Sequence, residues 1–338
     1  MKLSDVKVYR CPVCHSPFSL KTENDKEWID EGVLICSKNH SFNIKEGIPD
    51  FTWPKELANV DQETKDLYNK LASEYDKFAS IPFQTFYQDE NVVRDKMTDR
   101  LNLTPDSLVL EIGGGDGRGA EHLVKRLQKN GHLYFQELSP SFMGKAIERL
   151  KDYKDMVEYS IANASYLSFA DDYFDAALHF GGINTFADIK GCLKELARVV
   201  KPGGKIVVGD EGIGPWLRDT EFGKIMINSN PLIGYKIPFE LLPVEAREVK
   251  VEWIMMGAFF ILDFTVGEGE PKANYHIPIP SERGGTHWNR YYGHLEGITD
   301  KTKKLAYEAR KKSGKGMSEW LDDVVRKAAE TELGKSKS

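Results

Sequence analysis

The sequence has few cysteines, no long hydrophobic run and no excess of basic charge, and each shortage excludes a class of protein. Four cysteines in 338 residues are too few for a disulfide framework, and three of them are grouped with a histidine. The longest apolar stretch, Trp253–Val266, is interrupted by Asp263 and is too short to span a bilayer. Met1–Arg10 contains no apolar run of the kind that a signal peptide has. The net charge of −6 gives no general attraction to nucleic acid or anionic lipid. We therefore expect a soluble, cytoplasmic protein without a membrane segment.

Hydrophobic periodicity divides the chain into three parts. Residues 1–54 carry the cysteine cluster, residues 55–270 alternate strands and helices, and residues 271–338 form a C-terminal extension. Alternation of strands and helices predicts an α/β fold with a parallel, doubly wound sheet that binds ligands at the carboxyl ends of its strands. The expected strands are Leu108–Ile112, His132–Gln136, Val157–Ile161, Phe174–Phe180 and Lys205–Gly209. One helix is expected over Asp66–Phe78, with an apolar stripe of Leu67, Leu71, Tyr75 and Phe78.

The cysteine cluster has the spacing of a metal site. Cys11 and Cys14 form a C-x2-C pair, and Cys36 and His40 form a C-x3-H pair after a spacer. Two such pairs close a tetrahedral zinc site, and four protein ligands make the site structural rather than catalytic. A segment of about 50 residues cannot bury enough core to fold alone, so a metal would supply the missing stability. The sequence therefore predicts a zinc ribbon over residues 1–54.

A glycine-rich turn follows the first strand of the central part. Leu108–Ile112 runs through Glu111 into Gly113, Gly115 and Gly117, and a helical pattern begins at about Ala120. A buried strand, a tight glycine turn and a helix bring the backbone close to a nucleotide-like ligand. A dinucleotide loop would lack the carboxylate that precedes the glycines here.

This segment, Glu111-Ile-Gly-Gly-Gly-Asp-Gly117, resembles the acidic-x-G-x-G-x-G signature of class I S-adenosylmethionine-dependent methyltransferases. Leu167–Asp175 and Leu196–Gly204 resemble two further segments of that family, the second being its K-P-G-G turn. The resemblance implies a seven-stranded, Rossmann-like sheet whose closing antiparallel pair is Val249–Met256 and Phe259–Val266, with residues 211–249 as a lid-like insertion.

The resemblance also implies which residues bind the methyl donor. Glu111 would engage its cationic amino end, and Glu137 would accept both ribose hydroxyls. Asn163-Ala164 stands where the family commonly has Asp-Ala against the adenine amino group, and the asparagine oxygen can accept the same bond. Tyr68 and Tyr75-Asp76 resemble an element that lies over the donor in ubiquinone- and menaquinone-type methyltransferases.

The ribbon has a resemblance of its own. Cys11–Phe51 looks like the zinc ribbon of some ribosomal-RNA guanine methyltransferases, where the ribbon helps to hold RNA. Its ligand pattern is specific for zinc and not for RNA, and it also resembles ribbons attached to other methyltransferases.

Residues on the acceptor side are less constrained by pattern. Asn184, after the fourth strand, and Glu211, after the fifth, are candidates, together with Tyr75; Asn184 could instead cap a helix near Phe186, and Asp210-Glu211 could be a solvated strand end. His287 is the candidate base within an extension rich in His, Tyr and Arg, which could equally be a surface extension. His179, inside a strand, fits a satisfied core histidine.

The combined prediction is a methyltransferase that acts on a small molecule by in-line displacement, using S-adenosylmethionine and a structural zinc ion. An RNA methyltransferase is the alternative, but acidic residues offset the lysines and arginine of the ribbon, so nucleic acid is not the favoured partner. A non-catalytic protein that binds the donor is the third hypothesis. Two helical patterns in Thr299–Glu330, split at residues 312–316, predict a helical hairpin that could contact a second copy of the chain.

Overall fold

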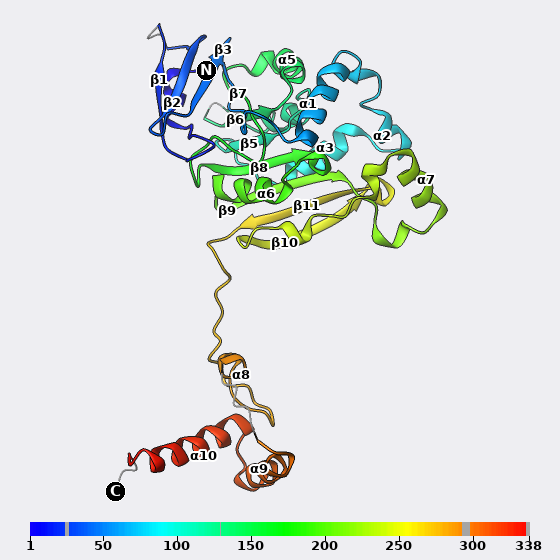
Figure 1. Cartoon of the computed structure of the whole chain (residues 1–338). Helices are drawn as coiled ribbons and strands as arrows, with labels where there is room; N and C mark the ends of the chain where they lie inside the picture. Colours follow the sequence, from blue (N-terminus) through cyan, green and yellow to red (C-terminus); the bar gives the residue numbers. More distant parts are fainter. Residues whose placement is uncertain (24–26, 129, 293–297, 336–338) are drawn as a thin grey trace. The chain divides into compact units, whose positions relative to one another are not determined.

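The computed structural model describes residues 1–23, 27–128, 130–292 and 298–335. These residues form two compact units, Met1–Glu270 and Pro271–Ser338, and each unit is described by itself (Figure 1). The first unit holds the cysteine cluster together with the alternating strands and helices, and the second holds helices of the C-terminal extension.

A seven-stranded sheet forms the centre of the first unit, in the order β10-β11-β9-β8-β5-β6-β7. The strands from β9 to β7 run parallel, and β11 and β10 complete the other edge in antiparallel pairing. The chain winds outward from β5 in both directions, so the predicted doubly wound, Rossmann-like architecture is confirmed. The strands are β5 (Leu108–Ile112), β6 (His132–Glu137), β7 (Val157–Ile161), β8 (Phe174–Phe180), β9 (Val200–Glu211), β10 (Ala246–Ile254) and β11 (Phe259–Val266).

Alternate side chains of the strands supply two hydrophobic cores, one on each face of the sheet. Leu110 and Ile112 of β5 belong to one core, and Val109, which precedes them, belongs to the other. The first face is covered by α6, whose Cys192 is fully buried, whereas α3, α4 and α5 contribute to the second core. These helices are α3 (Glu90–Asp99), α4 (Arg118–Val124), α5 (Pro140–Arg149) and α6 (Ile189–Val199).

The N-terminal segment forms a small antiparallel sheet in the order β1-β2-β3-β4. This sheet is joined to the edge of the central one, because the Phe51 N–H donates a hydrogen bond to the Ile161 carbonyl of β7 at 2.8 Å. The Tyr9 ring lies 4.9 Å from the Phe51 ring and 5.5 Å from the Phe169 ring, so one core runs through both sheets. The elements are η1 (Leu3–Lys7), β1 (Phe18–Lys21), β2 (Gly32–Cys36), β3 (Ser41–Lys45) and β4 (Ile48–Pro49).

The predicted single helix over Asp66–Phe78 is wrong. Helix α1 spans Asn59–Leu71, a short 3-10 turn follows at Tyr75–Lys77, and α2 spans Ile81–Thr85. Leu67, a member of the expected apolar stripe, is 53% exposed. Helix α1 turns a polar face inward instead, because it covers a ligand pocket rather than the hydrophobic core.

The stretch after β9 contains helix α7 (Glu221–Ser229) and three short 3-10 turns before β10 begins. Strand β10 begins at Ala246 and ends at Ile254, three and two residues earlier than expected for Val249–Met256. Trp216, Tyr235 and Phe239 of this stretch are exposed.

The second unit contains α8 (His287–Tyr292), α9 (Asp300–Ser313) and α10 (Met317–Glu332). Gly314 ends α9 in the left-handed conformation (φ +72°), which separates the two long helices as the sequence pattern predicted. No residue within α8, α9 or α10 is buried. Within the described ranges, the helices are all too short or too polar to cross a bilayer.

Candidate donor and acceptor pocket

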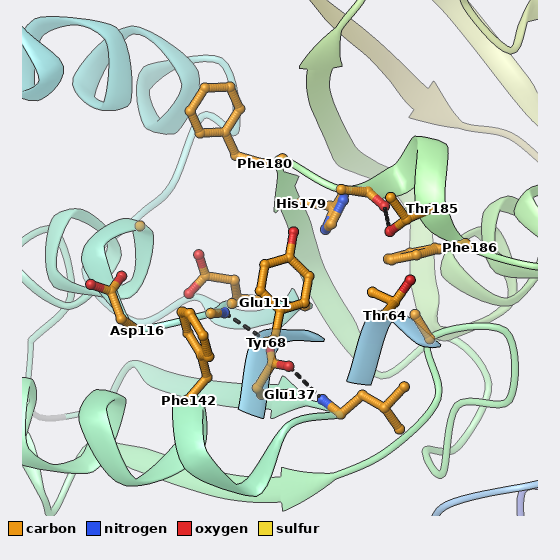
Figure 2. A pocket seen from close by; sticks show the side chains of 18 of the residues that line it. Thr64, Tyr68, Glu111, Asp116, Glu137, Phe142, His179, Phe180, Thr185 and Phe186 are labelled. Carbon is orange, nitrogen blue, oxygen red and sulfur yellow. Dashed lines mark hydrogen bonds between the residues drawn. The ribbon is translucent and has the colours of Figure 1, made fainter. Parts of the chain in front are cut away.

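A pocket opens at the carboxyl ends of β5, β6, β7 and β8, where a doubly wound sheet binds its ligands. Figure 2 shows Tyr68 reaching into it from α1, near Phe142 of α5 and Glu111 of β5. Most of the donor residues predicted from the sequence meet here. The lining includes Glu111, Gly113, Gly114, Gly115, Asp116, Glu137, Leu138, Phe142, Ala162, Asn163, Ala164, Tyr68 and Tyr75.

Gly117 and Gly119 show why the turn after β5 requires glycine. Gly117 has φ +82° at the start of α4, a conformation that disfavours residues with a Cβ atom. A Cβ atom on Gly119 would lie 2.2 Å from the Glu111 Oε1 atom. The glycines therefore let the turn close tightly and leave room for the carboxylate beside α4.

Glu111 is a buried carboxylate with spare bonding capacity. Its side chain is 3% exposed, and its Oε2 atom has no hydrogen-bond partner among the described residues. Burial raises the pKa of the Glu111 carboxyl to about 8, while the nearby Arg94 guanidinium acts in the opposite direction. An unpartnered acceptor in a closed site fits a cationic ligand group, which would favour the ionised carboxylate.

Glu137 is fixed at the end of β6 by backbone donors. Its carboxylate accepts hydrogen bonds at 2.8 Å from the N–H groups of Gly115, Leu138 and Ser139. Figure 2 shows the first two of these bonds. Burial raises the pKa of Glu137, and these three bonds oppose that rise because they favour the charged form. The bonds leave part of the carboxylate's acceptor capacity free for ligand hydroxyl groups.

Both polar atoms of the Asn163 side chain have partners within the protein, and its role against adenine stays a prediction. Its Oδ1 atom accepts the Ser165 N–H at 3.0 Å, and its Nδ2 group donates to the Asp61 carboxylate at 3.0 Å. Asp61 comes from α1, 102 residues earlier, and was not among the predicted site residues. Its only sequence signal is the spacing of Asp61, Thr64, Lys65 and Tyr68, which places all four on one face of a helix.

Tyr68 and Tyr75 frame the pocket with Phe142. The Phe142 ring lies 5.3 Å from the Tyr68 ring and 4.9 Å from the Tyr75 ring, both in edge-to-face geometry. Burial raises the pKa of both phenols, so they are neutral at pH 7. The Tyr68 hydroxyl lies 3.7 Å from the position that a Cβ atom would take on Gly182.

The acceptor-side candidates fall into two groups. Glu211 lines the pocket, whereas Asp210 is fully buried and accepts the N–H groups of Gly182 and Asn184 at 3.0 and 2.9 Å. The Asn184 side chain donates to the Glu211 carbonyl at 2.7 Å. Asp210 is therefore not a solvated strand end, and Asn184 caps no helix, because α6 begins at Ile189.

His179 is only half satisfied. Its Nδ1 atom bonds the Ile112 carbonyl at 2.8 Å, and its Nε2 atom has no partner among the described residues although the ring is fully buried. Burial lowers its pKa to about 4, so the ring is neutral. His179, Phe180 and Arg94 line the pocket and were missed because strand and helix periodicity alone predicts core or surface for such residues.

His287 lies at the first position of α8 in the second unit. The role of His287 as a base stays a prediction.

The four metal-ligand candidates converge in the ribbon. Their ligand atoms all lie within 4.8 Å of one another. Cys14 Sγ is 3.7 Å from Cys36 Sγ, and His40 Nδ1 is 3.4 Å from the Sγ atoms of both Cys11 and Cys36. Tetrahedral zinc with Zn–S bonds of about 2.3 Å needs sulfur atoms about 3.8 Å apart, so the cluster has the right size.

Residues 57–212 match the model of the ubiE/COQ5 methyltransferase family. Two relatives have the name ubiquinone/menaquinone biosynthesis C-methyltransferase UbiE. The one from Chromobacterium violaceum is 31% identical over 141 residues, which are 42% of this chain and 53% of that protein. The one from Laribacter hongkongensis is 29% identical over 194 residues, which are 53% of this chain and 75% of that protein. The chain thus spans about half the length of the first of these relatives.

Solved structures resemble the chain more remotely. Haemonchus contortus phosphoethanolamine N-methyltransferase 2, in complex with S-adenosyl-L-methionine, has a TM-score of 0.49 at 15% identity, over 67% of this chain and 63% of that one. A SAM-dependent methyltransferase from Aquifex aeolicus has a TM-score of 0.40 at 18% identity, over 51% of this chain and 89% of that one. The sheet order is that of the Rossmann-like methyltransferase fold. The segment that matches the ubiE/COQ5 family model is slightly less than half of the chain.

Proposed function

We propose that the protein transfers a methyl group from S-adenosylmethionine to a small-molecule acceptor. The observation that carries the proposal is the pocket that joins the glycine turn to Glu111, Glu137, Tyr68 and Tyr75. The donor supplies an activated methyl group on a sulfonium, so the protein mainly has to align the acceptor and exclude water. The relatives' name, C-methyltransferase, supports a carbon atom as the acceptor.

Two carboxylates of the pocket suit polar groups of the donor. The unpartnered Oε2 atom of Glu111 suits the donor's ammonium group, and the backbone-held Glu137 suits its ribose hydroxyls. Gly113, Gly115 and Gly117 keep the turn free of side chains beside these two carboxylates. Phe142 and Tyr68 close the pocket against water.

Glu211, Tyr75 and Asn184 are the residues that we assign to the acceptor side. Glu211 lines the same pocket as the donor carboxylates, and the Asn184 side chain bonds the Glu211 backbone. A carboxylate there can take a proton from an acceptor that must lose one, which is general-base catalysis. His287 belongs to the same proposal as an additional candidate base.

The ribbon is proposed to hold a structural zinc ion through Cys11, Cys14, Cys36 and His40. The size of the cluster and the soft ligand set support zinc, and four protein ligands leave no open position for catalysis. We also propose a cytoplasmic location, as the composition suggests.

Isotope transfer tests the proposal. The purified protein is incubated with cell extract and donor labelled in its methyl group, and label is then counted in RNA and in the small-molecule fraction. Label in small molecules is expected, and Glu111→Ala should abolish it. Label confined to RNA would favour the RNA methyltransferase, and donor binding without transfer to any fraction would favour the non-catalytic protein.

A further inference from the structure

The polar face of α1 points into the pocket at Asp61, Thr64, Lys65 and Tyr68. Asp61 is the one buried residue of α1, with 8% of its surface exposed. Helix α1 therefore presents a carboxylate to the pocket at a position where helices normally bury apolar side chains.

The Asp61 carboxylate is held but not saturated. Its Oδ1 atom accepts the Ala187 N–H at 2.9 Å, and its Oδ2 atom accepts the Asn163 amide at 3.0 Å. Two carboxylate oxygens offer about four acceptor positions, so about half remain free. Among the described residues, no lysine or arginine forms an ion pair with Asp61. A buried, unpaired carboxylate gains from any further donor that a ligand brings.

The orientation of Asn163 follows from its neighbours. Its Oδ1 atom must face the Ser165 N–H, and its Nδ2 group must face the Asp61 carboxylate, because a flipped amide would oppose both contacts. Asp61 is therefore the negatively charged acceptor of the pair, and Asn163 holds it in place.

The surroundings of the pair suit a flat, mostly apolar group with an amino substituent. Ala162 and Ala164, which flank Asn163 in the chain, line the pocket, as do Phe186, which precedes Ala187, and Leu138 after β6. The donor's adenine is the flat part of that molecule, and its exocyclic amino group is a hydrogen-bond donor.

We propose that the Asp61–Asn163 pair recognises the exocyclic amino group of the donor's adenine, with Asp61 supplying the charged acceptor. This inference rests on the proposed use of S-adenosylmethionine. In the methyltransferases that the sequence resembles, the charged acceptor is commonly an aspartate in the loop where Asn163 stands here. In this chain the charged acceptor would be Asp61 of helix α1. The same carboxylate also ties α1 to the loops after β7 and β8, through Asn163 and the Ala187 N–H.

The test compares two product-like ligands by calorimetry: S-adenosylhomocysteine and S-inosylhomocysteine, which carries an oxygen in place of the amino group. The wild-type protein should bind the adenosyl compound about 10- to 100-fold more tightly, the range expected for one hydrogen bond to a charged group. Asp61→Asn should bring the ratio of the two affinities close to one. Leu67→Ala, on the exposed face of the same helix, should keep the wild-type ratio.

The double variant D61N/N163D separates recognition from folding. In this variant the amide at position 61 donates to the carboxylate at position 163, so every hydrogen bond of the pair can still form. The variant also has one carboxylate in the pair, as the wild-type protein has. It should therefore restore both the Tm and the affinity ratio. An Asp61→Asn protein with the wild-type ratio would overturn the inference, as would a double variant that recovers Tm without the ratio. Failure of the wild-type protein to bind either ligand would instead contradict the proposed function.

Discussion

The regions that precede and follow the central sheet in the sequence are built in opposite ways. The ribbon contributes fully buried rings such as Tyr9 and Phe51 to a core that continues under the central sheet. The second unit has no buried residue in α8, α9 or α10, and lysine and arginine outnumber aspartate and glutamate by eleven to six over residues 301–338. The difference indicates that the ribbon is part of the folding unit of the central sheet, whereas the C-terminal extension forms a separate unit.

The largest effect should come from loss of a metal ligand. Cys36→Ala should remove the cooperative unfolding of the whole first unit, because structural zinc contributes about 10–16 kcal/mol in zinc-finger peptides and the ribbon core is shared. Differential scanning calorimetry and metal analysis measure this. Cys192→Ala, which alters a buried cysteine outside the cluster, is the matched control and should retain the metal and a single transition. An unchanged sheet transition in Cys36→Ala would show that the ribbon folds separately.

A smaller loss is expected from Phe51→Ala. Removing this fully buried ring should lower the free energy of unfolding by about 3–5 kcal/mol, since it packs on Tyr9, Phe18 and Phe42. Leu305→Ala, at a 59% exposed position of α9, should change it by less than about 0.5 kcal/mol. Urea unfolding followed by fluorescence provides both values, and equal effects would contradict the comparison.

Glu158 gives the boundary between ribbon and sheet a pH dependence. Burial, with the nearby Asp5 of the ribbon as the second cause, raises the pKa of the Glu158 carboxyl to about 8. The folded protein therefore binds a proton that the unfolded chain releases near pH 4.5, so this stability is present at low pH and is lost as the pH rises through about 8. The Tm should fall between about pH 4.5 and pH 8 and should level off above that range.

Glu158→Gln supplies the control, because it keeps the shape of the side chain and removes its titration. Its Tm should be flatter over the same interval, as measured by circular dichroism. If the Tm of Glu158→Gln fell with pH as steeply as the Tm of the wild-type protein, groups other than Glu158 would cause the pH dependence.

The smallest effect is expected from deletion of residues 271–338. The Tm of the first unit and its Kd for S-adenosylhomocysteine should stay unchanged, which calorimetry can measure. Turnover is the informative readout here: loss of turnover with an unchanged Kd would assign the second unit, including His287, to the acceptor side. A lower Tm would mean that the extension stabilises the sheet.

Much of the fold could be predicted because its strands are short, buried apolar runs. Leu108–Ile112, Val157–Ile161 and Phe174–Phe180 have the bounds expected from the sequence. Helix α1 was misplaced because periodicity assumes that a helix buries an apolar stripe, and α1 buries Asp61 over a pocket.

The site was harder to predict where it depends on distant partners. The glycine turn and its carboxylates are local patterns, and local patterns can be read from the chain. The bond between Asp61 and Asn163 joins residues 102 positions apart, and no pattern connects them. Asp210 lies at the end of β9, where the sequence allowed a solvated side chain. It is buried instead, because the turn Gly182–Asn184 folds back and donates two N–H groups to its carboxylate.

Strand β7 has two neighbours of different kinds. At Ile161 it accepts a hydrogen bond from Phe51 of the ribbon, and two residues later the chain reaches Asn163 in the pocket. One short segment, residues 161–163, therefore connects the ribbon with the proposed donor pocket. Thermodynamic reciprocity requires that any coupling between the two sites is equal in both directions, so if a nucleoside ligand raises the affinity of the ribbon for its metal, the metal must raise the affinity for that ligand by the same factor.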